Sequence, residues 1–358
     1  MIKRIDRYII RKYFGTFLLS MVLILSICVV FDVAEKIDDF HESNAPLRAI
    51  IFDYYMNFIP YFANMLTPLF SLISVIFFTS KMAYNTEIVA MLAGGISFHR
   101  IARPYMIVAL LIGLGLFGLV GYVIPRSNEV RLNFEDKYIQ KFKADMAMNV
   151  QFELEPGIIV YIERYEASRN RGVHFSLEEI HGKTLVSRMT AQHIICDSAN
   201  HWHVTDYLIR HFDGMYETIE QGQQLDTMIA MDPSDFYVTG EQAPQMTNPE
   251  LHHYMQKQKA RGMGSIQAFE NEYYQRFSMP FSVIILTFIG LSLSAQKVRG
   301  GTGLHVGIGI GISAVYILFN TVSTTFAVNG TMPILLAVWL PNMIFGIVAA
   351  LLYVKVPK

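Results

Sequence analysis

Charge is what this sequence has least of: only 16% of its residues are Asp, Glu, Lys or Arg, whereas 52% are hydrophobic. The shortage is concentrated in long runs without any charged residue. Because a helix needs about 20 apolar residues to cross a hydrocarbon core about 30 Å thick, runs of this length exclude an ordinary soluble domain. The uncharged runs are Phe14–Phe31, Tyr54–Ser80, Pro104–Pro125, Phe277–Gln296 and Gly300–Val354.

The last run is long enough to cross twice, and Asn329-Gly330-Thr331-Met332-Pro333 interrupts it near its middle. The sequence therefore predicts an α-helical membrane protein with six transmembrane helices, three on each side of a polar insert. We expect residues 1–125 to hold the first three helices, residues 126–247 to form the insert, and residues 248–358 to hold a connecting helix and the last three spans.

Cysteines and catalytic motifs are equally scarce. Cys28 falls in the first span and Cys196 in the insert, so no internal disulfide is expected. The chain has no G-x-x-x-x-G-K-[ST] nucleotide loop, no G-x-S-x-G elbow and no H-E-x-x-H. The uncharged runs also lack the acidic or Lys relay of an ion-coupled pump. We expect a non-catalytic protein without a cofactor, and any transport would draw its energy from another subunit.

Basic residues next to the predicted spans set the orientation, because Lys and Arg are retained on the cytoplasmic side. They place both termini in the cytoplasm and the insert outside. The first external loop is acidic instead, and no small-residue cleavage site follows the first run, so we expect that run to remain as a span. The net charge of −1 gives no indication of a nucleic-acid partner, and none is expected. The basic residues assigned to the inside are Lys3, Arg4, Arg7, Arg11, Lys12, Lys81, Arg100, Arg103, Lys297, Arg299, Lys355 and Lys358.

The insert has the texture of a β domain, with short β-rich segments separated by turn residues. This pattern predicts an antiparallel sandwich, a jelly roll or an open barrel. Charged helical sequence flanks it at Arg126–Phe142 and again at Asn248–Tyr274. The predicted strands are Val150–Leu154, Ile158–Ile162, His174–Leu177, Thr184–Met189, His193–Asp197, Trp202–Arg210, Tyr216–Ile219 and Met228–Met231.

Histidines gather in the second half of the insert, where His193, His201 and His203 lie near Cys196. Histidine and cysteine both bind zinc, and His201 and His203 would share one face of a strand. Cys196 has no paired cysteine, however, and the spacing matches no common zinc pattern, so we expect no metal site. Along Phe152–Ile162 the apolar residues alternate, which favours a buried core over a groove for an apolar ligand.

The connection between the second and third spans is short and amphipathic. Asn85 and Thr86 can cap a brief helix that carries Glu87 and Met91, and Gly94-Gly95 can end it. Two interpretations fit these residues equally well. The helix can lie on the lipid surface, or it can be a rigid lever that fits a groove on a soluble motor.

Several segments resemble the LptF/LptG (YjgP/YjgQ) family of lipopolysaccharide export permeases, and the resemblance covers most of the chain. It is sharpest in the connection between the second and third spans, whereas the β-rich insert matches only in pattern. The segments that carry it are Ile5–Ile9, Thr86–Ser97, Met246–Leu251, Glu270–Pro280 and Trp339–Asn342.

This resemblance implies a permease in the bacterial inner membrane whose insert is a periplasmic β-jelly-roll domain. It implies a heterodimer with a sister permease, surrounded by membrane lipids, with a lipopolysaccharide cavity between the two subunits. A cytoplasmic ATPase dimer would engage a coupling helix at residues 84–95. The lipid would pass to the jelly-roll domain and then to a periplasmic bridge protein of similar fold.

The resemblance also implies roles for individual residues. Glu87 and Met91 would contact the ATPase, with Gly94 and Gly95 fixing the turn. Basic residues would meet lipid phosphates, and Lys36 and Arg48 are the candidates, although six nearby acids depart from the family pattern. A lateral gate would lie between the first helix and the partner's fifth. Its residues here would be Phe17, Met21, Ile24, Gly307, Gly311 and Tyr316.

Two alternatives to this function stay open. The chain could be a permease for another glycolipid or for a lipoprotein. It could also be a membrane-anchored β domain that acts in assembly or signalling without transport.

Overall fold

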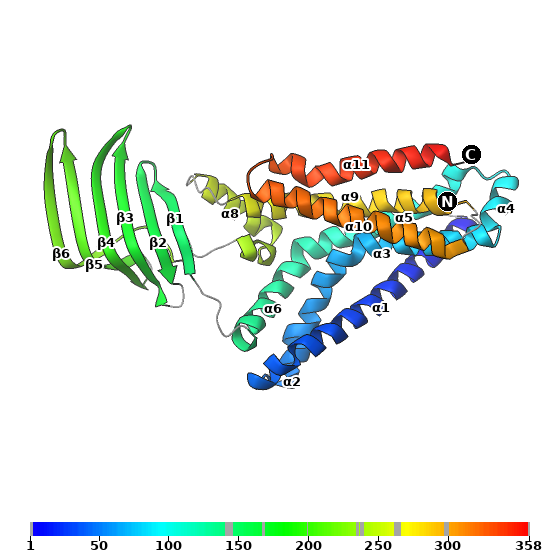
Figure 1. Cartoon of the computed structure of the whole chain (residues 1–358), viewed down its shortest axis with the longest axis horizontal. Coiled ribbons are helices and arrows are strands. Elements are labelled where there is room, and N and C mark those ends of the chain that lie inside the picture. Colours follow the sequence, from blue (N-terminus) through cyan, green and yellow to red (C-terminus); the bar gives the residue numbers. More distant parts are fainter. Residues whose placement is uncertain are drawn as a thin grey trace. The chain divides into compact units, whose positions relative to one another are not determined.

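The computed structural model describes residues 3–139, 146–166, 169–198, 200–233, 236, 240–260, 266–296 and 301–356. The chain folds into two units (Figure 1). A helical unit contains residues 1–140, 244–248 and 270–358, and a β-rich unit contains residues 141–243 and 249–269.

Six helices in the described part of the chain are long and apolar enough to cross a membrane, three before the insert and three after it. This confirms the predicted arrangement. The first three spans are longer than a bilayer requires, and two of them contain a π-helical segment. Their bounds are α1 (Arg4–Glu42); α2 (Leu47–Ala49), η1 (Ile50–Tyr55) and α3 (Met56–Tyr84); α5 (Phe98–Gly118), η2 (Leu119–Val123) and α6 (Ile124–Tyr138); α9 (Gln267–Ser294); α10 (Gly301–Val328); and α11 (Ile334–Lys355).

The spans end where the sequence predicts breaks. Gly330 adopts a positive φ of 71° after α10, and Pro333 then precedes α11. Pro60 and Pro68 lie inside α3, which remains one continuous helix. The predicted extension of the third span is α6, which reaches Tyr138; residues 140–142 lie outside the described residues.

Short polar contacts between helices hold the interior of the helical unit. The hydroxyl of Tyr13 on α1 lies 2.6 Å from Ser71 Oγ on α3 and 2.9 Å from Thr287 Oγ1 on α9. All three side chains are buried, so in an apolar surrounding each hydroxyl needs such a partner. The contacts therefore fix how α1 sits against α3 and α9.

Three of the segments that carry the family resemblance contribute polar side chains that join helices. The Asn342 amide on α11 donates to Ser278 O on α9 at 2.9 Å and accepts from the Tyr316 hydroxyl on α10 at 3.0 Å. The buried Arg276 guanidinium donates to Met246 O and Asn248 Oδ1 at 2.8 and 2.9 Å. These side chains hold α9, α10, α11 and the segment before α8 (Asn248–Ala260) in place.

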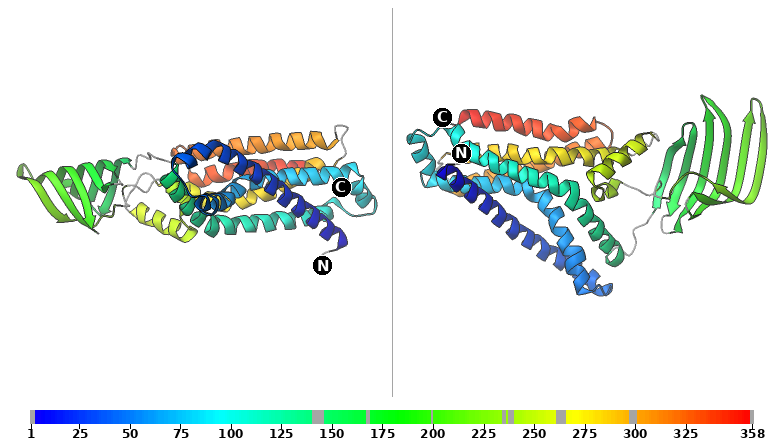
Figure 2. Two further views of the ribbon diagram at one scale, coloured as in Figure 1. Left: turned by 90° about the horizontal axis from the view of Figure 1, so that it is seen from below. Right: turned by 180° about the vertical axis from the view of Figure 1, so that it is seen from behind.

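The described chain ends and the short helix α4 (Glu87–Ala93) lie together at one end of the helical unit (Figures 1 and 2). The chain leaves this unit after α6 and re-enters it at α9, and both points lie at the opposite end. This follows from an odd number of crossings before the insert and an odd number after it.

The insert contains a six-stranded antiparallel sheet in which the strands follow chain order. One face carries a core that includes Phe152, Val160, Trp202 and Phe236, which confirms that the alternation in Phe152–Ile162 builds a core. A short 3-10 helix, η4 (Gly240–Gln245), and α8 follow the sheet. The strands are β1 (Met146–Glu155), β2 (Ile158–Glu166), β3 (Arg171–His181), β4 (Thr184–Ser198), β5 (His201–Asp213) and β6 (Tyr216–Met228).

The sequence divided two of these strands wrongly. Segments 184–189 and 193–197 are both parts of β4, and residues 216–228 form one strand, β6, with 229–231 outside it. Gln221 and Gly222 lie between two of the predicted strands and were interpreted as a turn, but the structure places them inside the ladder, where Gly222 pairs with Tyr207. A Cβ at Gly222 would lie 2.8 Å from the Tyr207 ring. The glycine therefore makes room for this ring rather than a turn.

Candidate functional site

Helix α4 is closed by its glycines as the sequence predicts. Gly95 has a φ of +81°, and its N–H donates to Leu92 O at 3.0 Å while Ile96 N–H donates to Met91 O at 3.1 Å. This pair of bonds is the Schellman arrangement, which satisfies the last carbonyl groups of a helix. At the other end Thr86 is left-handed, with a φ of 63°. Both turns are tight, so α4 is held at a fixed angle between α3 and α5.

The faces of α4 differ sharply in exposure. Ile88 is buried in the core of the helical unit, whereas Val89 is 55% exposed. Glu87 and Met91 are half-buried and line a shallow hollow of about 310 Å³ together with Tyr8 of α1. Val89 thus joins Glu87 and Met91 as a residue that a partner could contact, because its side chain is exposed whereas that of Ile88 is buried.

The start of α1 contacts the first residue of α4 and the start of the next helix, α5. The Tyr8 hydroxyl donates to the Glu87 carboxylate, in the first turn of α4, at 3.2 Å. The Arg100 guanidinium, which follows α4 at the start of α5, forms two hydrogen bonds with Asp6 at 2.7 and 2.6 Å. A bidentate pair of this kind is both strong and directional. Sequence reasoning missed these pairs because their members lie far apart in the chain.

At the other end of α1, Lys36 is enclosed by acidic and aromatic groups. Its ammonium lies 3.0 Å from Asp32 Oδ1 and 3.9 Å from Glu135 Oε1, and it donates a hydrogen bond to the Tyr54 hydroxyl. Arg131 pairs with Glu135 at 3.1 Å. The charge of Lys36 is therefore already opposed within the chain.

Arg48, the other candidate for a lipid phosphate, lies on α2 and is exposed. It is absent from the contacts of the Lys36 cluster among the described residues. The two candidates thus differ in one respect that matters for binding, because an exposed guanidinium can take up a phosphate without first breaking an ion pair.

The predicted gate residues divide between a buried and an open set. Phe17 and Met21 of α1 are buried in the core of the unit and Ile24 is half-buried. On α10, Tyr316 is buried and bonded to Asn342, whereas a Cβ at Gly307 or Gly311 would meet nothing within 4 Å. The predicted stripe on α1 thus faces its own subunit, and exposed side chains such as Leu19 and Val22 lie beside it.

The spans α1 and α10 are the least buried of the six. Within the most apolar stretch of each span, 11% of α1 and 22% of α10 are buried, against 33–56% for the others. Gly309, between the two open glycines, faces inward instead, since a Cβ there would lie 2.3 Å from Ile76 Cδ1 on α3. Helix α10 therefore packs closely on α3 through Gly309 and presents Gly307 and Gly311 outward.

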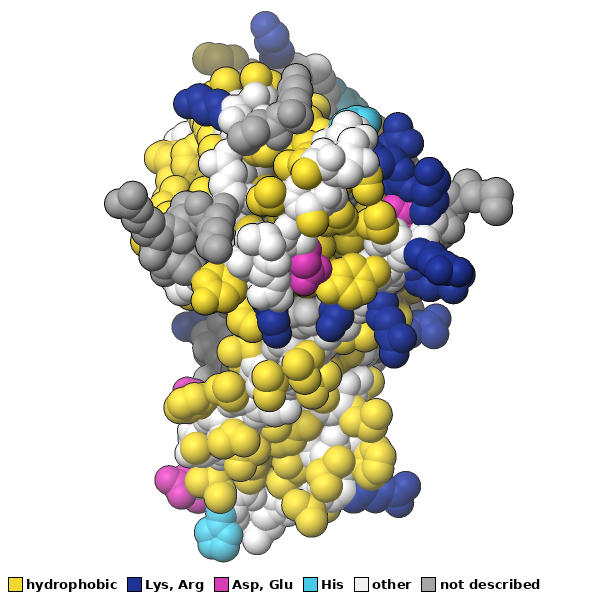
Figure 3. Space-filling model, turned by 90° about the vertical axis from the view of Figure 1, so that its right-hand side faces the viewer, with side chains coloured by type: hydrophobic (Ala, Val, Ile, Leu, Met, Phe, Trp, Pro, Cys, Tyr) yellow, Lys and Arg dark blue, Asp and Glu magenta, His cyan; other side chains and the backbone are white. Residues whose placement is uncertain are grey.

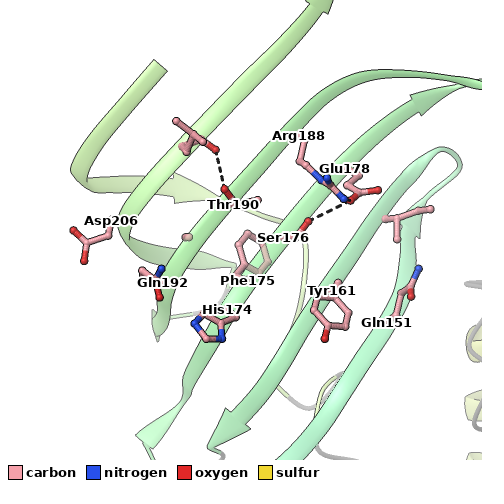
Figure 4. A pocket seen from close by; sticks show the side chains of 13 residues that line it. Gln151, Tyr161, His174, Phe175, Ser176, Glu178, Arg188, Thr190, Gln192 and Asp206 are labelled. Atoms are coloured by element: carbon pink, nitrogen blue, oxygen red, sulfur yellow. Dashed lines mark hydrogen bonds and ion pairs between the residues drawn. The ribbon is translucent and has the colours of Figure 1, made fainter. Parts of the chain in front are cut away.

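The face of the sheet opposite its core carries an open hollow of about 660 Å³. Figure 4 shows its polar lining, in which Arg188 forms an ion pair with Glu178 and Ser176 donates to the same carboxylate. His174 and Asp206 lie toward its other side. The lining is mixed, because Ile159, Phe175, Ala191 and Leu208 lie beside these polar groups.

A family model described as lipopolysaccharide export system permease LptF/LptG matches residues 7–355. The match includes all six spans and the insert. Among curated proteins, no sequence matches this chain.

Proposed function

Because the chain belongs to the LptF/LptG family of lipopolysaccharide export permeases, we propose that it forms one half of an ATP-driven exporter that extracts this lipid from the bacterial inner membrane. The export permease role and the multi-pass inner-membrane location follow from the family. The connection of α1 to the first residue of α4 and to the start of α5 supports the finer mechanism most directly, since it gives a soluble motor a path to a membrane helix.

We place α4 and both chain ends in the cytoplasm and the sheet in the periplasm. Basic side chains support this orientation, because many Lys and Arg residues gather at the end of the helical unit that carries α4 (Figure 3). Lys297, Arg299 and Lys358, which were assigned to the same side, lie outside the described residues.

A cytoplasmic ATPase dimer acts on α4 in this proposal. Its contacts would be Met91, Glu87 and the exposed Val89, on a helix whose turns at Thr86 and Gly95 hold it rigidly. A displacement of α4 then passes to α1 through Glu87 and Tyr8. ATP hydrolysis belongs to that partner, and this chain stays non-catalytic.

The gate lies between α1 of this chain and α10 of a sister permease, and reciprocally. The low burial of α1 and α10 supports this placement, since both have side chains available to a partner. Gly307 and Gly311 allow a partner helix to approach closely, which is how small residues promote helix association in membranes. Lipopolysaccharide enters where these helices separate.

Headgroup phosphates meet basic side chains at the outer end of the helical unit. Lys36 can bind a phosphate only when Asp32 or Glu135 gives way, whereas Arg48 is open to it. From there the lipid passes to the β domain and onward to a periplasmic bridge protein of similar fold.

Purification of the native complex tests this function. The chain, extracted from inner membranes in mild detergent, should bring an ATPase, a sister permease and bound lipopolysaccharide, all identified by mass spectrometry. A chain that purifies with none of them would contradict the exporter. A chain that brings the ATPase but another glycolipid or a lipoprotein would contradict the substrate alone.

A further inference from the structure

We propose that Asp197, His201 and His203 form a binding site for a divalent transition metal ion of the Zn²⁺ class. One possible ligand atom from each residue lies within 4.8 Å of the others. The site is on the β-rich unit and does not depend on the transport mechanism.

The backbone of the β4–β5 hairpin brings the three residues together. His201 and His203 alternate on β5, so both project to one face of the sheet while Trp202 between them is buried in the core. On β4 the ladder shifts register between Cys196 and Ser198. Asp197 lies at this irregularity, and a bulge of this kind re-aims a side chain, here toward the two histidines.

The atoms are spaced as metal ligands are. Asp197 Oδ1 lies 2.9 Å from His201 Nδ1, and Asp197 Oδ2 lies 3.0 Å from His203 Nε2. Ligands at about 2.0–2.2 Å from a tetrahedral zinc ion are about 3.4 Å from one another. A metal ion can therefore replace the shared protons if each Asp–His pair opens by about 0.5 Å and the two histidine nitrogens, which lie within 4.8 Å of each other, close around it.

Asp226 provides the second, independent observation. It lies on β6 directly opposite His203 and accepts a hydrogen bond from His203 Nδ1. Metal-binding histidines usually donate their other ring nitrogen to a carboxylate, which fixes the tautomer and the ring orientation. With Nδ1 engaged by Asp226, the other ring nitrogen of His203, Nε2, faces Asp197 and donates to it. A metal ion that displaces this proton would gain the Nε2 lone pair as a ligand.

The ligand types and their exposure define the class of ion. Two imidazoles and one carboxylate suit Zn²⁺ and its neighbours, whereas Ca²⁺ and Mg²⁺ prefer oxygen ligands alone. The side chains of Asp197 and His203 are 47% and 42% exposed, so the ion would exchange with solvent and keep water at its open positions. We expect micromolar affinity rather than a permanent structural site.

The sequence did not reveal this site because it suggested Cys196, rather than Asp197, as the possible partner of the histidines. Cys196 is buried on the core side of β4, so it cannot join the histidines. The third ligand is the residue after it, and the positioning carboxylate comes from β6, 23 positions beyond His203. Spacing rules for zinc motifs do not include such a set.

Metal titration of the full chain tests the proposal. Tag-free protein in detergent, stripped with EDTA, is titrated with Zn²⁺ against a chromophoric chelator, and Co²⁺ is added separately to record the visible d–d bands of a bound ion. We expect about one ion per chain with micromolar affinity. The double variant His201→Gln/His203→Gln should lose this binding and the bands. Asp226→Asn should weaken binding about 10–100-fold, as outer-shell changes do.

His181→Gln is the matched control, since His181 is an exposed histidine that pairs with Glu179 near the preceding hairpin. It should bind Zn²⁺ like the parent. Fluorescence of Trp202, recorded with Trp339 replaced by Phe in every protein, verifies that the sheet of each variant is folded. Failure of the parent protein to take up stoichiometric metal would overturn the proposal, as would unchanged binding in the double variant.

Discussion

The hydroxyl of Tyr8 on α1 donates a hydrogen bond to the carboxylate of Glu87 on α4, with 3.2 Å between the two oxygen atoms. The two residues are 79 positions apart in the chain. In the proposed mechanism this bond passes the motion of α4 to the gate helix.

Removal of the hydroxyl should therefore weaken coupling without preventing assembly. We expect Tyr8→Phe to reduce ATP-driven lipid release from reconstituted vesicles about two- to tenfold, the range for one partly exposed hydrogen bond to a charged group. ATP hydrolysis and co-purification of the ATPase should persist. Tyr122→Phe, at an exposed tyrosine, is the control and should match the parent. Equal release by all three proteins would refute the coupling role of Tyr8.

Loss of the Asp6–Arg100 ion pair should destabilise the helical unit. Asp6 is buried and the Arg100 side chain is 27% exposed, so Asp6→Asn should cost about 1–3 kcal/mol, less than a fully buried pair. Thermal unfolding in detergent measures this cost. The exchange variant Asp6→Arg/Arg100→Asp should recover part of the lost stability. The exposed Glu35→Gln serves as control.

The glycines of α10 should respond differently to larger side chains. Gly309→Leu places atoms against Ile76 and should lower the unfolding temperature of the isolated chain. Gly307→Leu has open space and should leave that temperature near the parental value, but it should weaken pairing with the sister permease, as measured by pull-down. A Gly307→Leu chain that pairs normally would contradict the proposed partner face.

Acid should destabilise the sheet through His193. The pKa of His193 lies below its usual value because burial and then the nearby Arg171 cation disfavour the protonated ring. The unfolded chain, with a histidine pKa of about 6.5, then binds the proton more readily. Stability from the neutral ring is complete above about pH 6.5 and falls as the pH drops below it toward the folded pKa.

His193→Gln should therefore lose less stability than the parent between pH 7.5 and 5.5. Trp202 fluorescence reports unfolding of the sheet once Trp339 on α11 is replaced by Phe in both proteins. Hydrogen bonds to Asp226 and Asp197 raise the pKa of His203, so protonation of this ring stabilises the folded sheet as the pH falls. Because this effect opposes that of His193, only the difference between variant and parent is informative. An equal loss of stability in both proteins would contradict the prediction.

Local composition predicted the spans and the β-rich insert. The length of an uncharged run and the positions of turn residues can both be read from neighbouring residues in the sequence. It also predicted the end of α4, where Gly95 has the left-handed conformation that the absence of a Cβ permits. The predicted strand boundaries were wrong at Gly222. The sequence does not distinguish a glycine that makes room for a ring, as here for Tyr207, from a glycine in a turn. Tertiary packing alone distinguishes these two uses.

Contacts between residues far apart in the chain could not be predicted from the sequence for the same reason. Nothing near Asp6 indicates Arg100, and nothing near Asp197 indicates Asp226. The orientation of α1 also required the structure: the apolar residues surround this helix, so its pattern did not show that Phe17 and Met21 face inward while Leu19 and Val22 face outward.

Helix α1 has 39 residues without a break. At 1.5 Å per residue it is about 58 Å long, nearly twice the thickness of the hydrocarbon core. It is thus a stiff rod that carries the Tyr8 and Asp6 contacts at one end and the Lys36 cluster at the other. A tilt of about 5° pivoted at its inner end would carry its outer end through about 5 Å. That distance is comparable to one helical turn, so in the proposed mechanism a small rotation of α1 at its α4 end would be enough to separate Lys36 from Glu135.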